Sequence, residues 1–168
     1  MKCKIVSLNI TTGKYLNVIN EIISLAKSGI SSYVCISNVH MCIEALWNKE
    51  FANQVNSTNI VTPDGIPLAK AIKLIYGKQD RIAGMDIMPD LIKRAEEEGL
   101  GVYFYGRSAD MIDQTEVYVS KNYPDLKNAH YFSPPFRQLT DKEEEDVVNK
   151  INSSGVNILF VALGCPKQ

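Results

Sequence analysis

The sequence predicts an α/β fold of the Rossmann-like, doubly wound type, with a mainly parallel sheet and helices on both faces. Short, almost continuously apolar runs alternate with segments whose apolar residues recur at helical spacing. Parallel strands need crossover helices, and these helices bury both faces of the sheet, so its strands are apolar throughout. A length of 168 residues with 45% hydrophobic content suits one domain, expected to span residues 1–168 and to end at a Gly-x-Pro-x-Gln motif.

The first half of the chain shows three strand-like runs separated by helical patterns. Gly29 and Gly77 end two of the helices, because glycine readily follows a helix C-terminus. A polar stretch precedes the third strand. The expected elements are a strand at 3–10, a helix at 16–26, a strand at 33–37, a helical pattern through 41–46, a strand at 59–62 and a helix at 68–75.

The second half continues the alternation to the end of the chain. A short extended piece at 81–84 leads into a helix whose apolar residues share one face. The acidic run at 142–146 suits the first turn of a helix, where carboxylates complement the dipole. The expected elements are a helix at 86–98, a strand at 101–105, a helix at 109–122, a strand at 129–132, a helix at 141–153 and a strand at 157–163.

Composition excludes several classes of protein. The net charge is −1 with scattered Lys and Arg, so the sequence has no overall signature of binding to nucleic acid or to an acidic membrane surface. Four cysteines without a Cys-x-x-Cys pair are typical of reduced thiols in the cytosol. Without a membrane-spanning apolar segment or a signal peptide, we expect a soluble cytoplasmic chain. Its apolar helices can also form a subunit interface in a homo-oligomer.

Polar side chains follow two of the predicted strands and form the main candidate site. Asp64 follows the strand at 59–62, and Ser37 and Asn38 end the strand at 33–37. Ligands bind at the carboxyl ends of parallel strands, so Asp64 can act there as a general base, and the amide of Asn38 can hold a sugar hydroxyl or a phosphate oxygen. The alternative for Asp64 is a helix N-cap or a turn residue, and the alternative for Asn38 is a helix cap.

Other candidate binding residues lie in later loops. Arg81 can clamp a diphosphate, or it can pair with Asp86 in a structural ion pair. Gly106 and Arg107 follow a strand at the start of a helix, where the backbone can approach a phosphate. Phe136 can stack on a base, or it can lie in the core. Neither the dinucleotide glycine pattern nor the Walker lysine loop is present, so NAD binding and ATP hydrolysis are not indicated.

Several short motifs, taken together and in order, resemble the WecG/TagA/CpsF family of bacterial glycosyltransferases. The order in which they occur is more specific than any one of them, and they span nearly the whole chain. The matching segments are Asn38 to Met41, Pro63 to Leu68, Arg81 to Asp86, Tyr105 to Gly106, Tyr123 to Pro124, Pro134 to Arg137 and Gly164 to Gln168.

The resemblance implies an inverting hexosyltransferase of cell-surface polysaccharide or teichoic acid synthesis. It implies transfer of a hexose such as N-acetylmannosamine from a UDP-sugar to a polyprenyl-diphosphate-linked sugar. In this family Asp64 falls on the proposed catalytic base, Asn38 on a pocket asparagine and Gln168 on the glutamine of the Gly-x-Pro-x-Gln motif. The sequence has no Asp-x-Asp pair to chelate a divalent ion, so we expect a metal-independent site with no cofactor beyond the UDP-sugar substrate.

The sequence departs from the family in two respects. The family often has Thr-x-Asn where this chain has Ile36-Ser37-Asn38, so the hydroxyl of the threonine is missing, and whether Ser37 replaces it is open on the sequence. Family members also continue into a basic and apolar C-terminal segment that helps to form the active site and touches the membrane. This sequence ends at Gln168, so we expect a truncated chain that needs this segment for activity and for peripheral attachment to the inner face of the cytoplasmic membrane.

Two other functions are open on the sequence. A non-catalytic nucleotide-sugar-binding module would keep the features at Gly106 and Phe136 but would need no base. An interaction domain would use all of its polar turns as caps. Binding of UDP without turnover is expected of the module, and no UDP binding is expected of the interaction domain.

Overall fold

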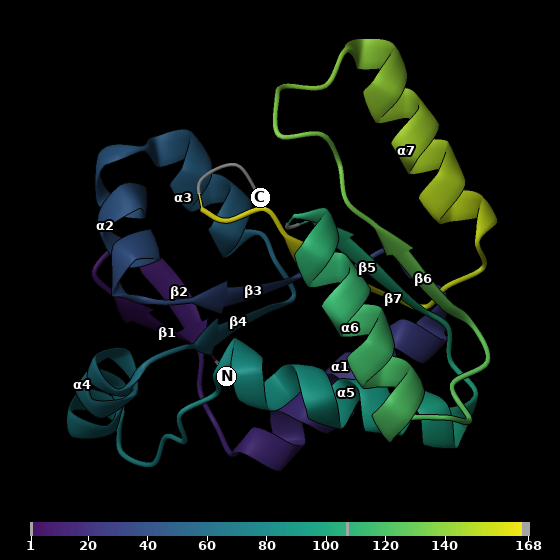
Figure 1. The fold of residues 1–168 in the computed structure, drawn as a ribbon. Coiled ribbons are helices and arrows are strands. Elements are labelled where there is room, and N and C mark those ends of the chain that lie inside the picture. The colour runs from purple at the N-terminus through teal and green to yellow at the C-terminus, as the bar shows by residue number, and fades with distance from the viewer. Residues whose placement is uncertain (1, 107, 166–168) are drawn as a thin grey trace. The chain divides into compact units, whose positions relative to one another are not determined.

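The computed structural model describes residues 2–106 and 108–165 and divides the chain into two compact units, residues 1–91 and 92–168. The predicted α/β fold with parallel sheets is confirmed (Figure 1). The single domain over residues 1–168 stays a prediction. None of the described helices is both long and apolar enough to cross a bilayer.

The first unit contains a parallel strand pair and an antiparallel hairpin. Its elements are β1 (Lys2–Ile5), β2 (Leu8–Thr11), α1 (Tyr15–Ser28), β3 (Val34–Ser37), α2 (Val39–Trp47), α3 (Lys49–Asn56), β4 (Ile60–Pro63), α4 (Ile66–Tyr76) and the start of α5 (Gly84–Glu98). Strands β3 and β4 run parallel, with Ser37 opposite Pro63. Strand β2 lies beside β4, where the backbone N–H of Val61 donates to Thr11 Oγ1 at 3.0 Å.

Two predictions for this unit were wrong or incomplete. The single strand expected at 3–10 is the hairpin of β1 and β2, because the chain turns at Val6, whose φ of 55° is rare for a β-branched residue. Helix α3 occupies the polar stretch for which we predicted no element. Phe51 and Val55, one turn apart, are its buried residues, and Asn48 Oδ1 caps it by accepting from the Phe51 N–H at 3.0 Å.

The second unit is built on a three-stranded parallel sheet in the order β6-β5-β7. Besides the end of α5, it contains β5 (Val102–Gly106), α6 (Ala109–Asn122), β6 (Ala129–Phe132), α7 (Asp141–Ser153) and β7 (Ile158–Ala162). The predicted bounds of α6, β6 and α7 are confirmed. Phe104 on the central strand stacks on Tyr131 and Phe160 of its two neighbours, with ring centroids 5.1 and 5.4 Å apart. This ladder of rings joins the three strands on one face.

Candidate functional site

Asp64 is the first residue after β4, and hydrogen bonds of the backbone hold it in place. Its N–H donates to the carbonyl oxygen of Ser37 at 2.7 Å, across to the end of β3. The carbonyl of the preceding Pro63 accepts from the N–H of Ile82 at 3.1 Å. The turn is therefore fixed between strand β3 and the segment that leads into α5.

The carboxylate of Asp64 does not cap helix α4. The N-cap is Gly65, whose φ of 88° is a conformation that favours glycine, and no side chain caps this helix. Asp64 is half-buried, and its carboxylate has no hydrogen bond or ion pair with any other described residue. The helix-cap alternative is thus wrong for Asp64, whereas the turn-residue alternative stays open, and its role as a base stays a prediction.

Asn38 does cap a helix, as the structural alternative predicted. Its Oδ1 accepts from the backbone N–H of Met41 at 3.1 Å, in the first turn of α2. The side chain is exposed, and its Nδ2 has no hydrogen-bond partner among the described residues. A substrate could still be contacted by the Nδ2 donor and by the second lone pair of Oδ1, and that role stays a prediction.

Two hydroxyl groups are buried at the same strand ends without a well-formed hydrogen bond. Ser37 and Thr62 are both fully buried, and neither hydroxyl oxygen has a well-formed hydrogen bond with the described part of the chain. The Ser37 hydroxyl does lie near the Cys42 thiol, where it opposes the rise of the Cys42 pKa that burial causes. Ser37 was a candidate from the sequence, whereas Thr62 was missed. A signal for Thr62 did exist, since it is a polar residue inside a buried strand, two positions before Asp64.

Arg81 forms an ion pair within its own motif. Its Nη2 lies 2.5 Å from Asp86 Oδ2, and both side chains are 40% exposed. This confirms the structural ion pair, while a diphosphate clamp stays a prediction. Gly84, between the two, packs close to β3, because a Cβ at this position would lie 3.5 Å from the side chain of Ile36.

The second unit holds the remaining candidates. Gly106 ends β5 with a φ of 116°, and a Cβ there would lie 2.7 Å from the carbonyl oxygen of Ala162 in β7. The backbone conformation and the packing against β7 therefore require glycine here, whether or not a ligand binds. Phe136 is fully exposed, so the prediction that it lies in the core was wrong. Arg107 and Gln168, both predicted to bind substrate, lie outside the described residues.

Two hollows of the second unit lie away from these candidates. They run along α6, one over its outer surface near Val117 and the other between α6 and β6 near Tyr131, and neither is lined by Gly106 or Phe136. Glu116 lines the second hollow, and together with burial, the larger cause, its charge raises the pKa of Tyr131 to about 12. Across the described ranges, no three His, Cys, Asp or Glu side chains gather as metal ligands.

Parallel strands that end in polar turns are typical of α/β proteins, in which ligands generally bind at the carboxyl edge of the strands. The sequence profile of the glycosyl transferase WecG/TagA/CpsF family matches residues 3–168, and the chain belongs to this family.

Two curated relatives carry the name N-acetylglucosaminyldiphosphoundecaprenol N-acetyl-beta-D-mannosaminyltransferase. The one from Bacillus spizizenii is 32% identical over 139 residues, which cover 82% of this chain and 52% of the relative. The one from Bacillus subtilis is 27% identical over 140 residues, 83% of this chain and 53% of the relative. The chain thus spans about half the length of the curated relatives that it matches.

Proposed function

We propose that this chain belongs to an inverting, metal-independent glycosyltransferase that moves a hexose of the N-acetylmannosamine type from a UDP-sugar to a polyprenyl-diphosphate-linked sugar. The product would enter a cell-surface polysaccharide or teichoic acid. The names of the two relatives describe, for those proteins, transfer of N-acetylmannosamine to a diphosphoundecaprenol-linked N-acetylglucosamine. Family membership supports the reaction class for this chain.

One observation carries the proposal, namely the position of Asp64. Its backbone is tied to the end of β3 by the bond to Ser37, at the carboxyl edge of β4, and its carboxylate has no partner among the described side chains. A structural aspartate often caps a helix or pairs with a cation, and among the described residues this one does neither. A carboxylate on a fixed turn at the ligand edge of a sheet suits the role of a general base.

In the proposed reaction Asp64 takes the proton of the acceptor hydroxyl. The hydroxyl oxygen forms a bond to the anomeric carbon of the donor sugar while the bond from that carbon to the diphosphate breaks on the opposite side. The electron pair of the broken bond leaves with UDP. General-base assistance of this kind contributes about a hundredfold to ten-thousandfold in rate.

The departing diphosphate needs positive potential or N–H donors. Helix N-termini supply both, and α6 begins just after Gly106 and Arg107, so we propose that this turn binds the diphosphate. We further propose that the uracil ring of UDP stacks on the exposed Phe136. Ser37, Asn38, Arg81 and Gln168 are proposed as further contacts to the sugar or the phosphates. The enzyme would work at the inner face of the cytoplasmic membrane, where a polyprenyl-linked acceptor is held.

The proposal is tested by a transfer assay on the full-length gene product. UDP-N-acetylmannosamine and a lipid-linked N-acetylglucosaminyl diphosphate are mixed with the protein in EDTA, and the products are analysed by mass spectrometry for the added sugar and by NMR for its anomeric configuration. We expect the acceptor to gain one N-acetylhexosamine with the opposite anomeric configuration. UDP binding without any transfer would instead favour the non-catalytic module, and the absence of UDP binding would favour the interaction domain.

A further inference from the structure

The residues between β2 and α1 hold the loop that carries Arg81. The Gly13 N–H donates to Oε1 of Gln79 at 3.1 Å, and the Tyr15 N–H donates to Oδ2 of Asp80 at 2.9 Å. Gln79 is buried, so its contact belongs to the packed part of the first unit. The loop between α4 and α5 is therefore anchored at two residues that come directly before Arg81.

The side chain of Tyr15 makes a further contact, with the start of α5. Its hydroxyl oxygen lies 2.8 Å from the carbonyl oxygen of Asp86 and 2.7 Å from Oδ2 of Asp90, so two acceptors share its one proton. Burial, the larger cause, and the hydrogen bond with Asp90 raise the pKa of this hydroxyl, so it stays a donor at neutral pH. Pro89 has no N–H to donate back to the first turn of α5, so a donor from outside the helix stabilises this turn.

Asp86 links this contact to Arg81. Nη2 of Arg81 lies 2.5 Å from Oδ2 of Asp86, and its Nε and Nη1 have no hydrogen-bond partner among the described residues. A guanidinium that is paired at one edge keeps its other donors in a fixed direction. The Ile82 N–H donates to the Pro63 carbonyl oxygen at 3.1 Å, so Arg81 and Asp64 each adjoin a residue of the same main-chain bond.

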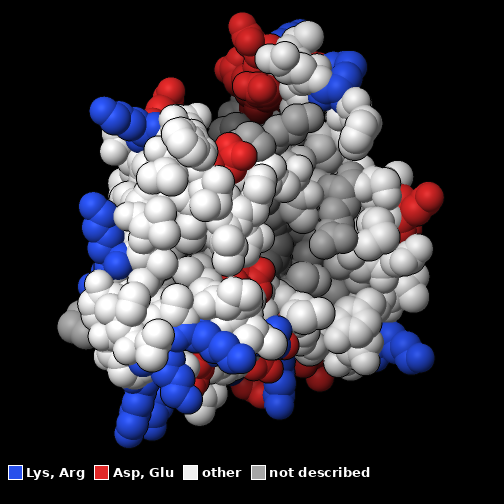
Figure 2. All heavy atoms as spheres, turned by 90° about the vertical axis from the view of Figure 1, so that its left-hand side faces the viewer, with Lys and Arg blue, Asp and Glu red and all other residues white. Residues whose placement is uncertain are grey.

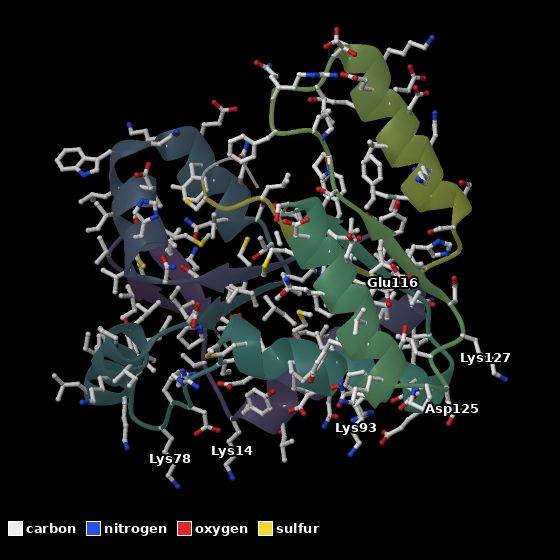
Figure 3. The ribbon with its side chains drawn as sticks, viewed as in Figure 1. Lys14, Lys78, Lys93, Glu116, Asp125 and Lys127 are labelled. Atoms are coloured by element: carbon white, nitrogen blue, oxygen red, sulfur yellow. The ribbon has the colours of Figure 1, made fainter. Side chains whose placement is uncertain are left out.

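The charges around Arg81 are mixed rather than of one sign. Figure 2 faces the side that carries α2 and α4 and shows Lys and Arg side chains gathered in its lower part, with acidic side chains among them. Lys14 and Lys78, from the two joined segments, extend outward at neighbouring points of the first unit (Figure 3). Residues 78–86 carry two basic and two acidic side chains. Recognition of a diphosphate there would depend on the orientation of single groups more than on a general positive potential.

We propose that Tyr15 is a positioning residue for Arg81, whose free donors bind the diphosphate of the nucleotide. The Tyr15 hydroxyl fixes the first turns of α5, these turns fix the Asp86 carboxylate, and the carboxylate orients the guanidinium. The inference rests on the proposed function, because it assigns Arg81 to the phosphates of UDP. A tyrosine with a structural role alone would stabilise the fold without a specific effect on phosphate binding.

The experiment is calorimetric titration of the full-length gene product and its Tyr15→Phe variant with UDP. We expect the variant to bind UDP about threefold to tenfold more weakly, because a misdirected guanidinium loses hydrogen bonds to the phosphates. The affinity for uridine, measured by displacement of UDP, should stay the same, since uridine has no phosphate. In an Arg81→Gln background Tyr15→Phe should change UDP affinity by less than about twofold, because the group that it positions is gone.

Tyr33→Phe is the matched control within the same unit. The Tyr33 hydroxyl also contacts two oxygen atoms, the Gln54 carbonyl oxygen at 2.6 Å and Ser57 Oγ at 2.7 Å, and both belong to α3 and its C-terminus. Each of the two variants loses one phenolic hydroxyl with two polar contacts. Urea denaturation should therefore show comparable losses of stability, whereas UDP binding should weaken in Tyr15→Phe only.

Four results would overturn the positioning role. They are unchanged UDP affinity in Tyr15→Phe, an equal loss of affinity in Tyr33→Phe, an equal loss for uridine, or an undiminished further loss in the Arg81→Gln background. Each of them can occur while the original protein binds UDP and transfers the sugar, so the proposed function would stand. The absence of UDP binding by the original protein would overturn both the positioning role and the proposed function.

Discussion

The backbone N–H of Asp64 donates a 2.7 Å hydrogen bond to the carbonyl oxygen of Ser37, which ties the turn after β4 to the end of β3. Because the bond joins main-chain atoms, it does not depend on either side chain. The carboxylate of Asp64 and the hydroxyl of Ser37 can therefore be replaced without releasing the turn. Main-chain atoms hold the turn in place, whereas side-chain atoms would perform the chemistry, so a substitution of either side chain tests its chemical role alone.

Removal of the buried hydroxyls should not destabilise the first unit. Thr62 has no hydrogen-bond partner for its side chain among the described residues, and the Ser37 hydroxyl has only the weakly hydrogen-bonding thiol of Cys42 nearby. A buried hydroxyl without a good partner is unfavourable. We expect Ser37→Ala and the isosteric Thr62→Val to change the free energy of unfolding by less than about 1 kcal/mol, or to increase it. Urea denaturation measures this. A loss well above that value would mean that these hydroxyls have partners in the folded protein.

Gly106→Ala should destabilise the second unit strongly. The new Cβ would meet the carbonyl oxygen of Ala162 at 2.7 Å, and a φ of 116° is unfavourable for alanine. We expect a loss of about 3 kcal/mol. The matched control is Gly155→Ala, where φ is 69° with nothing within 4 Å of the added carbon, and about 1 kcal/mol should be lost. Equal losses in urea denaturation of the two variants would contradict the close approach of β5 and β7.

Glu143 should titrate far below an ordinary glutamate. Hydrogen bonds from the Arg137 guanidinium, the larger cause, and from the Thr140 backbone N–H lower its pKa from 4.5 to about 2. A lowered folded-state pKa stabilises the start of α7 above about pH 4.5, and this stabilisation is lost as the pH falls from there towards 2. NMR titration of the Glu143 side-chain carboxyl measures the midpoint. Arg137→Gln should return it towards 4.5, and an ordinary midpoint in the unmodified chain would contradict the pair.

Phe136 should contribute to nucleotide binding but not to folding. The ring is fully exposed, so Phe136→Ala removes no core packing. If the ring stacks on the base, its loss should weaken UDP binding by about fivefold or more, and Phe136→Trp should preserve the affinity. Calorimetric titration with UDP measures this. Val148→Ala, at an exposed apolar residue of α7, is the control, and equal affinity in Phe136→Ala and Val148→Ala would remove Phe136 from the site.

Local signals in the sequence predicted much of the fold. Helix α7 was predictable because Thr140 and Glu143 form a capping box and acidic residues fill its first turn. The hairpin of β1 and β2 was not, because Val6 and Ser7 turn the chain without glycine, proline, asparagine or aspartate. Helix α3 was hidden because only two buried residues, Phe51 and Val55, carry its helical period.

The candidate site was predictable in position more than in detail. The order of strands and polar turns located Asp64 and Ser37 at neighbouring strand ends, because parallel strands share a carboxyl edge. Whether a side chain caps a helix or remains available depends on dihedral angles that the sequence does not reveal. Asn38 proved to be a cap, whereas at Asp64 the neighbouring Gly65 takes that position.

The most direct test of the central claim is single-turnover transfer by Asp64→Asn in the full-length gene product, with UDP affinity measured on the same preparation. Asparagine keeps the shape of the side chain and the main-chain tie to Ser37 but cannot accept the proton. We predict a rate lower by about a hundredfold to ten-thousandfold, with unchanged folding and an unchanged dissociation constant for UDP. A rate within a few-fold of the original would contradict the role of Asp64 as the base.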